Sequence, residues 1–347
     1  MMSWLETLNA LGVQVDELGN CQVSAAESRD AAVTVTPLTH LGLFSVTGPD
    51  AEKFLQGQLS CDVQQLSAGK SLLGSHCNIK GSMISLSRLM PVENGFWLRT
   101  ERPILDTAMA NLKKYMIFSK AESHNRSDEI VGLGISGAQA DRALLAEGFT
   151  LPAETGEFAV YGSGLLIRVP GERFELWLPV EQAKTLLSGL LKEATLADTN
   201  SWKLQDIRSG IPSLDSATLE TFIPQMTNLQ VFDGVSFSKG CYTGQEVITR
   251  LQHRGKLNRP MYRLAFSADQ TPPPGTAINT PERAGVGTVV SAAMTSEQQG
   301  ELLAVILKTS FDDTETALTL EGGDQPLQRL TLPYELDPEL FERPQRL

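Results

Sequence analysis

The order of apolar and polar residues in the first part of the chain predicts alternating strands and helices. Residues 41–46 (LGLFSV) form a short apolar run that is typical of a buried strand. After Pro49, which suits a first helical turn, apolar residues recur at helical spacing up to residue 59. Residues 72–100 read as an antiparallel meander with glycine turns, and 101–117 read as a second amphipathic helix.

A similar order recurs between residues 130 and 195. Apolar runs at 130–137, 165–169 and 174–179 predict strands, while 138–148 and 180–194 have helical periodicity. The pattern repeats but the residues do not. Two consecutive α+β units of this kind indicate an α+β protein with two ferredoxin-like subdomains.

The C-terminal part has a different pattern. The run TPPPG near residue 272 marks a break, and short apolar strands surround it without a convincing helix. This pattern is typical of a small β-barrel or sandwich. The 347-residue chain is therefore divided into a first subdomain, a second subdomain, a segment that completes them, and a C-terminal β-barrel, with limits at 1–125, 126–200, 201–262 and 263–347.

Composition excludes several protein classes. Hydrophobic residues make up 41% of the chain and charged residues 20%, so it can bury a core. The net charge of −12 argues against a protein that coats nucleic acid non-specifically. No run of about eighteen apolar residues predicts a membrane span, so we expect no membrane association.

The N-terminus and the cysteines indicate a cytoplasmic protein. The first twenty residues are acidic and lack a basic region and a cleavage site, so we expect no signal peptide. The four cysteines (Cys21, Cys61, Cys77 and Cys241) are far apart and form no C-x-x-C pair, which predicts neither a disulfide framework nor a metal site. We also expect Cys241 to hold no stable iron–sulfur cluster alone, because a cluster needs about four ligands.

The segment 239–263 has the strongest local chemistry. It holds one acidic residue, Glu246, against six basic residues: Lys239, Arg250, Arg254, Lys256, Arg259 and Arg263. Such a run can be a solvated face or an anion site for a carboxylate or phosphate. Cys241 lies among these cations and among glycines, which suits a reactive thiolate; a buried cysteine that acts as a small hydrophobe is the equal alternative.

Several stretches together resemble one family. They are FSVTGPDAEKFLQGQLSCDV at 44–63, HCNIKGSM at 76–83, LKKYMIFSK at 112–120 and FIPQMTNLQVFDGVSFSKGCYTGQE at 222–246. They resemble the YgfZ family of folate-binding proteins, and the signature KGCYTGQE is specific to it. The resemblance covers residues 38–265 clearly and the C-terminal module more weakly.

The resemblance implies a fold and a role. The fold would be that of the glycine-cleavage T-protein, with its subdomains and C-terminal β-barrel around a central folate-binding channel. The role would be a folate-binding accessory factor that supports iron–sulfur enzymes, among them a tRNA methylthiotransferase, and thereby tRNA modification. The cofactor would be tetrahydrofolate or a folate derivative.

The resemblance also assigns residues. Cys241 would be the functional thiol, and Trp202, in SWKLQDIRSGIP, the tryptophan near the ligand. Leu41 stands where the family has a second tryptophan, which removes one stacking surface. The remaining ligand-binding candidates are Lys239, Tyr242, Gln245, Glu246, Arg250 and Arg254. Core packing is the alternative for Trp202, and capping of a helix N-terminus is the alternative for Gln245 and Glu246.

Two other functions stay open. The first is a tetrahydrofolate-dependent one-carbon transferase. The T-protein has an acidic pair after its glycine turn, but residues 80–89 (KGSMISLSRL) contain no acid, so Asp62 or Glu246 would have to replace it. The second is direct tRNA binding through the 239–263 cluster and the lysines at 113, 114 and 120, and a weak tRNA contact is expected on this basis.

Overall fold

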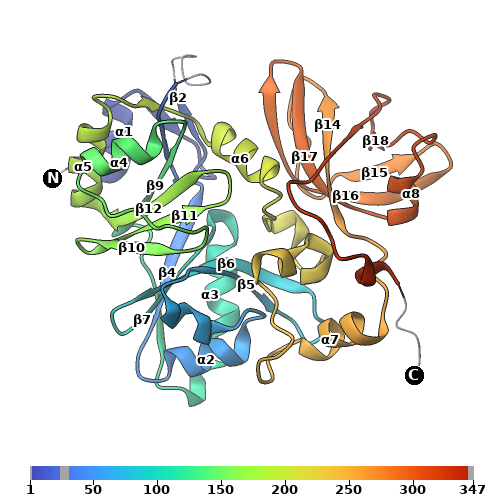
Figure 1. Ribbon diagram of the computed structural model, residues 1–347, viewed down its shortest axis with the longest axis horizontal. Helices are drawn as coiled ribbons and strands as arrows, with labels where there is room; N and C mark the ends of the chain where they lie inside the picture. The colour runs from blue at the N-terminus through green and yellow to red at the C-terminus, as the bar shows by residue number, and fades with distance from the viewer. Residues whose placement is uncertain (1, 24–30, 343–347) are drawn as a thin grey trace.

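In the part of the chain that the structure describes, three β-sheets of five or six strands and one two-stranded sheet are surrounded by helices. The computed structural model describes residues 2–23 and 31–342, apart from the side chains of residues 67 and 68. Figure 1 shows two sheets stacked at the left and a third at the upper right, with helix α6 between the upper two sheets and helix α7 at the lower right. Within the described residues, no helix is both long enough and apolar enough to cross a membrane.

The first sheet has five strands in the order β5-β6-β7-β4-β8. They are β4 (Leu41–Thr47), β5 (Leu72–Cys77), β6 (Met83–Val92), β7 (Gly95–Glu101) and β8 (Glu122–Asn125). The expected meander is confirmed, because β5, β6 and β7 pair antiparallel in sequence order. Helices α2 (Ala51–Gln58) and α3 (Leu105–Lys113) contribute apolar side chains to one hydrophobic cluster with this sheet.

The second sheet repeats this arrangement in the order β10-β11-β12-β9-β3-β13. Its strands are β3 (Thr34–Pro37), β9 (Ile130–Ser136), β10 (Phe158–Tyr161), β11 (Gly164–Val169), β12 (Arg173–Pro179) and β13 (Thr195–Leu196). Helices α1 (Trp4–Ala10), α4 (Ala140–Ala146) and α5 (Val180–Leu190) share its outer cluster. The strand–helix periodicity therefore predicted both α+β units.

The third sheet is a curled six-stranded half-barrel in the order β18-β15-β16-β17-β14-β19. Its strands are β14 (Met261–Ser267), β15 (Ala277–Thr280), β16 (Arg283–Ser296), β17 (Gln299–Ile306), β18 (Thr319–Leu320) and β19 (Gln328–Leu330). A short helix, α8 (Lys308–Asp312), interrupts the expected all-strand pattern. Five residues are too few to give a visible helical repeat.

The remaining elements connect these units. They are the hairpin β1 (Val13–Val15) with β2 (Cys21–Val23), the helices α6 (Thr199–Arg208) and α7 (Gln245–Arg254), and the 3₁₀ turns η2 (Val63–Ala68), η3 (Arg102–Ile104), η4 (Met116–Phe118), η5 (Ser216–Thr218), η6 (Pro224–Thr227), η7 (Leu229–Phe232) and η8 (Pro338–Phe341).

One strand of the second sheet comes from the start of the chain. Strand β3 precedes the first unit but pairs with β9 of the second sheet, whereas β8, the last strand of the first unit, pairs with β4 of the first sheet. The inner faces of both sheets share one apolar cluster that includes Leu43, Trp97, Ile167 and Trp177. The subdomain limits at 125 and 200 stay a prediction, and β3, from within residues 1–125, belongs to the second sheet.

Candidate functional site

A buried charge cluster lies between the two left-hand sheets. Arg88 of β6 and Arg99 of β7 are direct cross-strand neighbours, which alone would be repulsive. Glu175 of β12, in the facing sheet, offsets this repulsion. Arg99 donates to both Glu175 oxygens at 3.1 and 2.7 Å, and Arg88 Nε lies 3.8 Å from one of them. Trp177 Nε1 donates to the same carboxylate at 3.1 Å.

The cluster keeps Glu175 ionised. Burial raises the pKa of Glu175, but the guanidinium groups of Arg99 and Arg88 and the hydrogen bonds from Arg99 and Trp177 outweigh burial and lower that pKa to about 2. Burial lowers the pKa of Arg88 to about 10, against the attraction of Glu175. Charges held in this way are strongly coupled, so loss of one leaves the others buried and unpaired.

Trp202 of α6 is buried next to this cluster. The guanidinium of Arg173 lies 4.3 Å from the centre of its ring, and the opposite contact is with Gly134, where a Cβ atom would collide with the ring. Arg173 also donates to the Trp202 carbonyl at 3.3 Å and pairs with Asp206, one helical turn further along α6. The indole face is therefore occupied by protein groups, as the core-packing alternative expects.

Leu41 lies in the same apolar cluster as Trp202. The structure thus brings these two predicted residues together, although neither presents a free aromatic face. The carbonyl of Leu41 accepts a hydrogen bond from Arg102 at 3.4 Å.

Two buried nitrogen atoms here, Arg88 Nε and His40 Nδ1, have no hydrogen-bond partner among the described residues, although Arg88 Nε lies within ion-pair distance of Glu175. Burial, with the nearby charges of Lys203, Arg99 and Arg102, lowers the pKa of His40 well below its ordinary value, so its ring is neutral. The unused hydrogen-bonding capacity of these two atoms suits a ligand with a polar edge. A folate pterin is such a ligand, so the donor set fits it.

The signature loop lies elsewhere, at the start of α7. Gly244 adopts φ +83° immediately before α7, where its Cα lies close to the carbonyl of Asn78. Only glycine fits this position, because an added Cβ atom would lie 2.6 Å from that oxygen. Thr243 anchors the loop to α2, since its N–H donates to the Gly57 carbonyl at 3.3 Å.

Cys241 is exposed, whereas Cys21, Cys61 and Cys77 are buried. The alternative of a buried hydrophobic cysteine is therefore wrong for Cys241. Burial raises the pKa of Cys61 and of Cys77 to about 12, which leaves both as inert thiols at neutral pH.

The side chains next to Cys241 make their contacts within the protein. Lys239 Nζ donates to the carbonyls of Leu59 and Cys61 at 2.8 and 2.7 Å and lies 4.9 Å above the Tyr242 ring. Burial lowers the pKa of Lys239 to about 8. Tyr242 is buried, and its N–H donates to Gln245 Oε1 at 3.3 Å, so the Gln245 side chain holds the loop that precedes α7 without capping the helix itself.

The exposed face of α7 carries the other predicted residues. Gln245, Glu246, Arg250 and Arg254 line a shallow cavity of about 500 Å³ together with Thr249 and His253. Arg250 and Arg254 are exposed on this face. The structure therefore divides the predicted site into an interior pair, Trp202 and Leu41, and a surface group on the signature segment.

Comparisons with known proteins agree with this architecture. Residues 21–163 match the family described as GCVT N-terminal domain. The chain is 36% identical to the tRNA-modifying protein YgfZ of Cronobacter sakazakii, over 90% of this chain and 96% of that one. It is 37% identical to the protein of the same name from Pectobacterium carotovorum, over 89% and 94% of the two chains.

The chain belongs to the YgfZ family. The solved structure of the glycine cleavage system aminomethyltransferase T from Bartonella henselae superposes with a TM-score of 0.77 over 94% of this chain and 96% of that one, at 17% identity. This likeness confirms the T-protein-like fold that the family resemblance implied.

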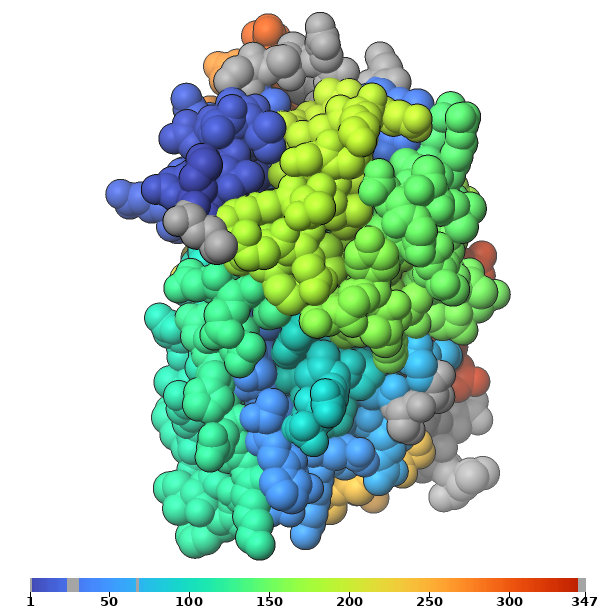
Figure 2. Space-filling model, turned by 90° about the vertical axis from the view of Figure 1, so that its left-hand side faces the viewer, coloured from blue at the N-terminus to red at the C-terminus, as the bar shows by residue number. Residues whose placement is uncertain are grey.

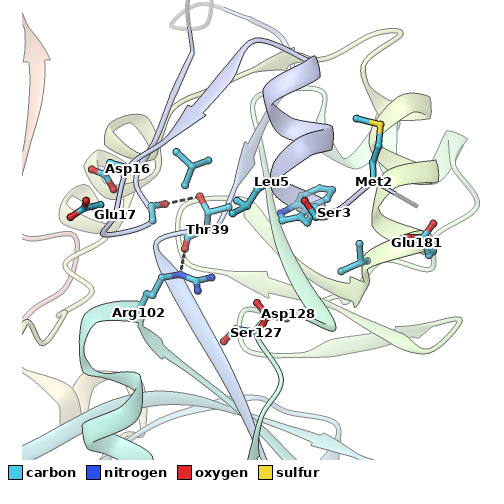
Figure 3. Close-up of a pocket in the computed structure, with 14 residues that line it drawn as sticks. Met2, Ser3, Leu5, Asp16, Glu17, Thr39, Arg102, Ser127, Asp128 and Glu181 are labelled. Atoms are coloured by element: carbon cyan, nitrogen blue, oxygen red, sulfur yellow. Dashed lines mark hydrogen bonds between the residues drawn. The ribbon is translucent and has the colours of Figure 1, made fainter.

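A second cavity, of about 520 Å³, lies outside the signature segment (Figure 3). It is lined by the N-terminal turn of α1, the β1–β2 turn and Arg102, whose Nε donates to the Thr39 carbonyl at 2.6 Å. Four carboxylates line it against this one cation: Asp16, Glu17, Asp128 and Glu181. Its charge disfavours an anionic ligand such as a folate tail.

Sequence reasoning missed the interior charges. These charges lie within apolar strands, at Arg88, Arg99 and Glu175. A charged residue at an inward-facing strand position was the one sequence feature that could have indicated them. Because that position depends on strand register, the signal can be read only after pairing is known.

Proposed function

We propose that this protein is a folate-binding accessory factor that supports the assembly or repair of iron–sulfur enzymes and thereby tRNA methylthiolation. The observation that carries the proposal is the exposed thiol of Cys241 in the signature loop. A chain 36% identical to proteins named as tRNA-modifying presents this thiol at its surface, while the other three cysteines are buried.

The interior supports folate as the cofactor. Arg88 Nε would donate to the pterin edge and the neutral His40 ring would donate to it or accept from it, while Trp202 and Leu41, both packed in the core, would border the site without stacking on the ligand. A folate tail is anionic and would be drawn to exposed guanidinium groups such as Arg250 and Arg254 of α7. When bound, a reduced folate would supply one-carbon chemistry; these residues bind and orient it.

The alternative is a tetrahydrofolate-dependent one-carbon transferase. It requires a free carboxylate close to the ligand. Asp62 accepts hydrogen bonds from Gln56 Nε2 at 2.8 Å and from the Gln64 N–H at 3.3 Å, and Glu246 is exposed on α7. Neither placement favours a role for these carboxylates as acid or base in the interior.

The test is complementation in a strain that lacks the gene. We expect 2-methylthio nucleosides in tRNA, measured by mass spectrometry, to fall on deletion and to return with wild type but not with Cys241→Ala. Cys61→Ala is the matched control for a buried thiol. Unchanged methylthiolation after deletion would refute the accessory role and would make folate turnover the first activity to measure.

A further inference from the structure

The lower end of the molecule exposes apolar side chains that a folded protein normally buries. Among the described residues, the three most exposed large apolar side chains are Phe118 (98%), Ile79 (79%) and Ile117 (78%). Tyr115 and Val247 are also exposed. An exposed apolar group of this kind, bordered by polar residues, is typical of an interaction site.

These side chains belong to segments that contact one another. The Tyr115 ring lies edge-on to His76 at 5.9 Å, and His76 precedes the turn at residues 78–81 in the β5–β6 hairpin. At the other side of that turn, a Cβ atom on Gly81 would lie 3.1 Å from Val247 of α7. Figures 1 and 2 both place the turn after α3, helix α2 and the signature segment at this end.

The same segments carry positive charge. Residues 78–82, 113–120 and 241–250 contain five exposed basic side chains and one acidic side chain, Glu246. The basic residues are Lys80, Lys113, Lys114, Lys120 and Arg250. Outside these segments, Glu220 and Asp50 contribute carboxylates, which accept from Asn78 Nδ2 and from the Lys120 N–H. In a chain of net charge −12, this surface favours a partner with acidic groups around an apolar centre.

We propose that this end, which we call the apolar–basic surface, is the docking site for the iron–sulfur enzyme that the protein serves; the choice of partner rests on the proposed function. Docking there would bring the partner to the exposed Cys241 thiol, because the loop that carries Cys241 is fixed on α2 and against the β5–β6 turn. The surface has three exposed aliphatic side chains, Ile79, Ile117 and Val247, beside the two rings of Tyr115 and Phe118, and aliphatic groups favour a protein over RNA. Stacking of tRNA bases on the two rings is the competing outcome of the test.

A lipid surface is also disfavoured. Interfacial anchors usually present one amphipathic helix with all its apolar residues on a single side. Here the apolar residues come from separate turns and from the first turn of α7. The membrane therefore becomes one outcome of the test.

The experiment measures binding of the purified full-length protein to the purified tRNA methylthiotransferase of the same cell by biolayer interferometry. We expect Ile117→Ser with Phe118→Ser to weaken binding about tenfold or more. Val160→Ser, at a side chain that is 69% exposed on β10, is the matched control and should change binding less than about twofold. Both variants alter exposed side chains and should fold normally.

Two further measurements locate the contact. Lys113→Glu with Lys114→Glu should weaken binding and reduce its dependence on salt. A photo-crosslinker attached to Cys241, the exposed cysteine among the four, should capture the methylthiotransferase, and Ile117→Ser with Phe118→Ser should abolish that capture.

Several outcomes would overturn the proposal. Absence of binding by wild type, or equal binding by the double serine variant, would refute docking at this surface. The double serine variant should also be tested for binding to anionic lipid vesicles, to tRNA alone and to a second copy of the chain. If it loses one of these interactions while enzyme binding is unchanged, the surface is assigned to that partner. The complementation result is independent of all these measurements, so the accessory role and the docking site can fail separately.

Discussion

The interior charge cluster and the signature helix both use arginine, but in opposite ways. Arg99 and Arg173 are held in the interior by Glu175 and Asp206, with little or no exposure to water. Arg250 and Arg254 stand on the exposed face of α7 and line an open cavity. The interior arginines therefore serve folding as well as any ligand, whereas the α7 arginines are accessible to a ligand from solvent, which would have to order them.

Of the substitutions that compare the two regions, Glu175→Gln should change the free energy of unfolding most. This change leaves the buried guanidinium groups of Arg88 and Arg99 without their countercharge, so we expect a loss of about 3–5 kcal/mol in the free energy of unfolding. Urea denaturation at neutral pH measures it. Glu193→Gln, at an exposed position, is the control and should stay within about 0.5 kcal/mol. A stable Glu175→Gln protein would mean that the cluster does not depend on this ion pair.

The same carboxylate predicts a pH dependence. Its folded-state pKa of about 2 lies below the ordinary value of 4.5, so its stabilising contribution is complete above pH 4.5 and is lost as the pH falls toward 2. We expect the stability difference between wild type and Glu175→Gln to narrow by about 3 kcal/mol over that range. Urea denaturation at several pH values measures this difference. A difference that stays constant with pH would contradict the assignment of the low pKa.

A matched pair of arginine substitutions sharpens the comparison. Arg173→Ala removes the group that covers the Trp202 ring and pairs with Asp206, and should cost about 2–4 kcal/mol. Arg250→Ala on α7 should change the free energy of unfolding by less than about 0.5 kcal/mol. Thermal and urea unfolding of both variants provide the measurement, with tryptophan fluorescence reporting any change around Trp202. Equal losses in the free energy of unfolding for Arg173→Ala and Arg250→Ala would contradict the distinction between a structural arginine in the interior and an exposed arginine on α7.

The smallest expected effect on stability comes from the thiol. Titration of the native protein with a disulfide reagent should modify one cysteine rapidly, and denaturant should release the other three. Cys241→Ser should abolish the rapid phase while it changes unfolding by less than about 0.5 kcal/mol. A rapid phase that persists in Cys241→Ser would place the reactive thiol at one of the buried positions.

Local sequence patterns predicted most elements because these patterns act over a few residues. The helices α2 and α3 follow apolar residues at helical spacing, and Ala108 and Leu112 are buried as that spacing requires. Asn94 and Gly95 predicted the turn between β6 and β7, and both residues have positive φ. The short helix α8 was missed, because five residues carry too little periodicity.

The signature segment was also largely readable, since its glycines, cations and lone cysteine are adjacent in sequence. The sequence did not predict which of these residues contact other parts of the protein and which stay exposed. Lys239 is two residues from Cys241, yet its ammonium binds the carbonyls of Leu59 and Cys61. A contact between residues separated by about 180 positions depends on packing and not on local spacing.

The sequence by itself determined the α+β class, the repeated units, the family and the position of the signature cysteine, because each is carried by local periodicity or by a contiguous motif. Tertiary structure alone decided that β3 joins the second sheet and that Arg88, Arg99 and Glu175 meet between the two sheets. It also decided that the side chains of Ile79, Phe118 and Val247 are exposed. These arrangements depend on strand register and on long-range burial, which no short stretch of sequence encodes.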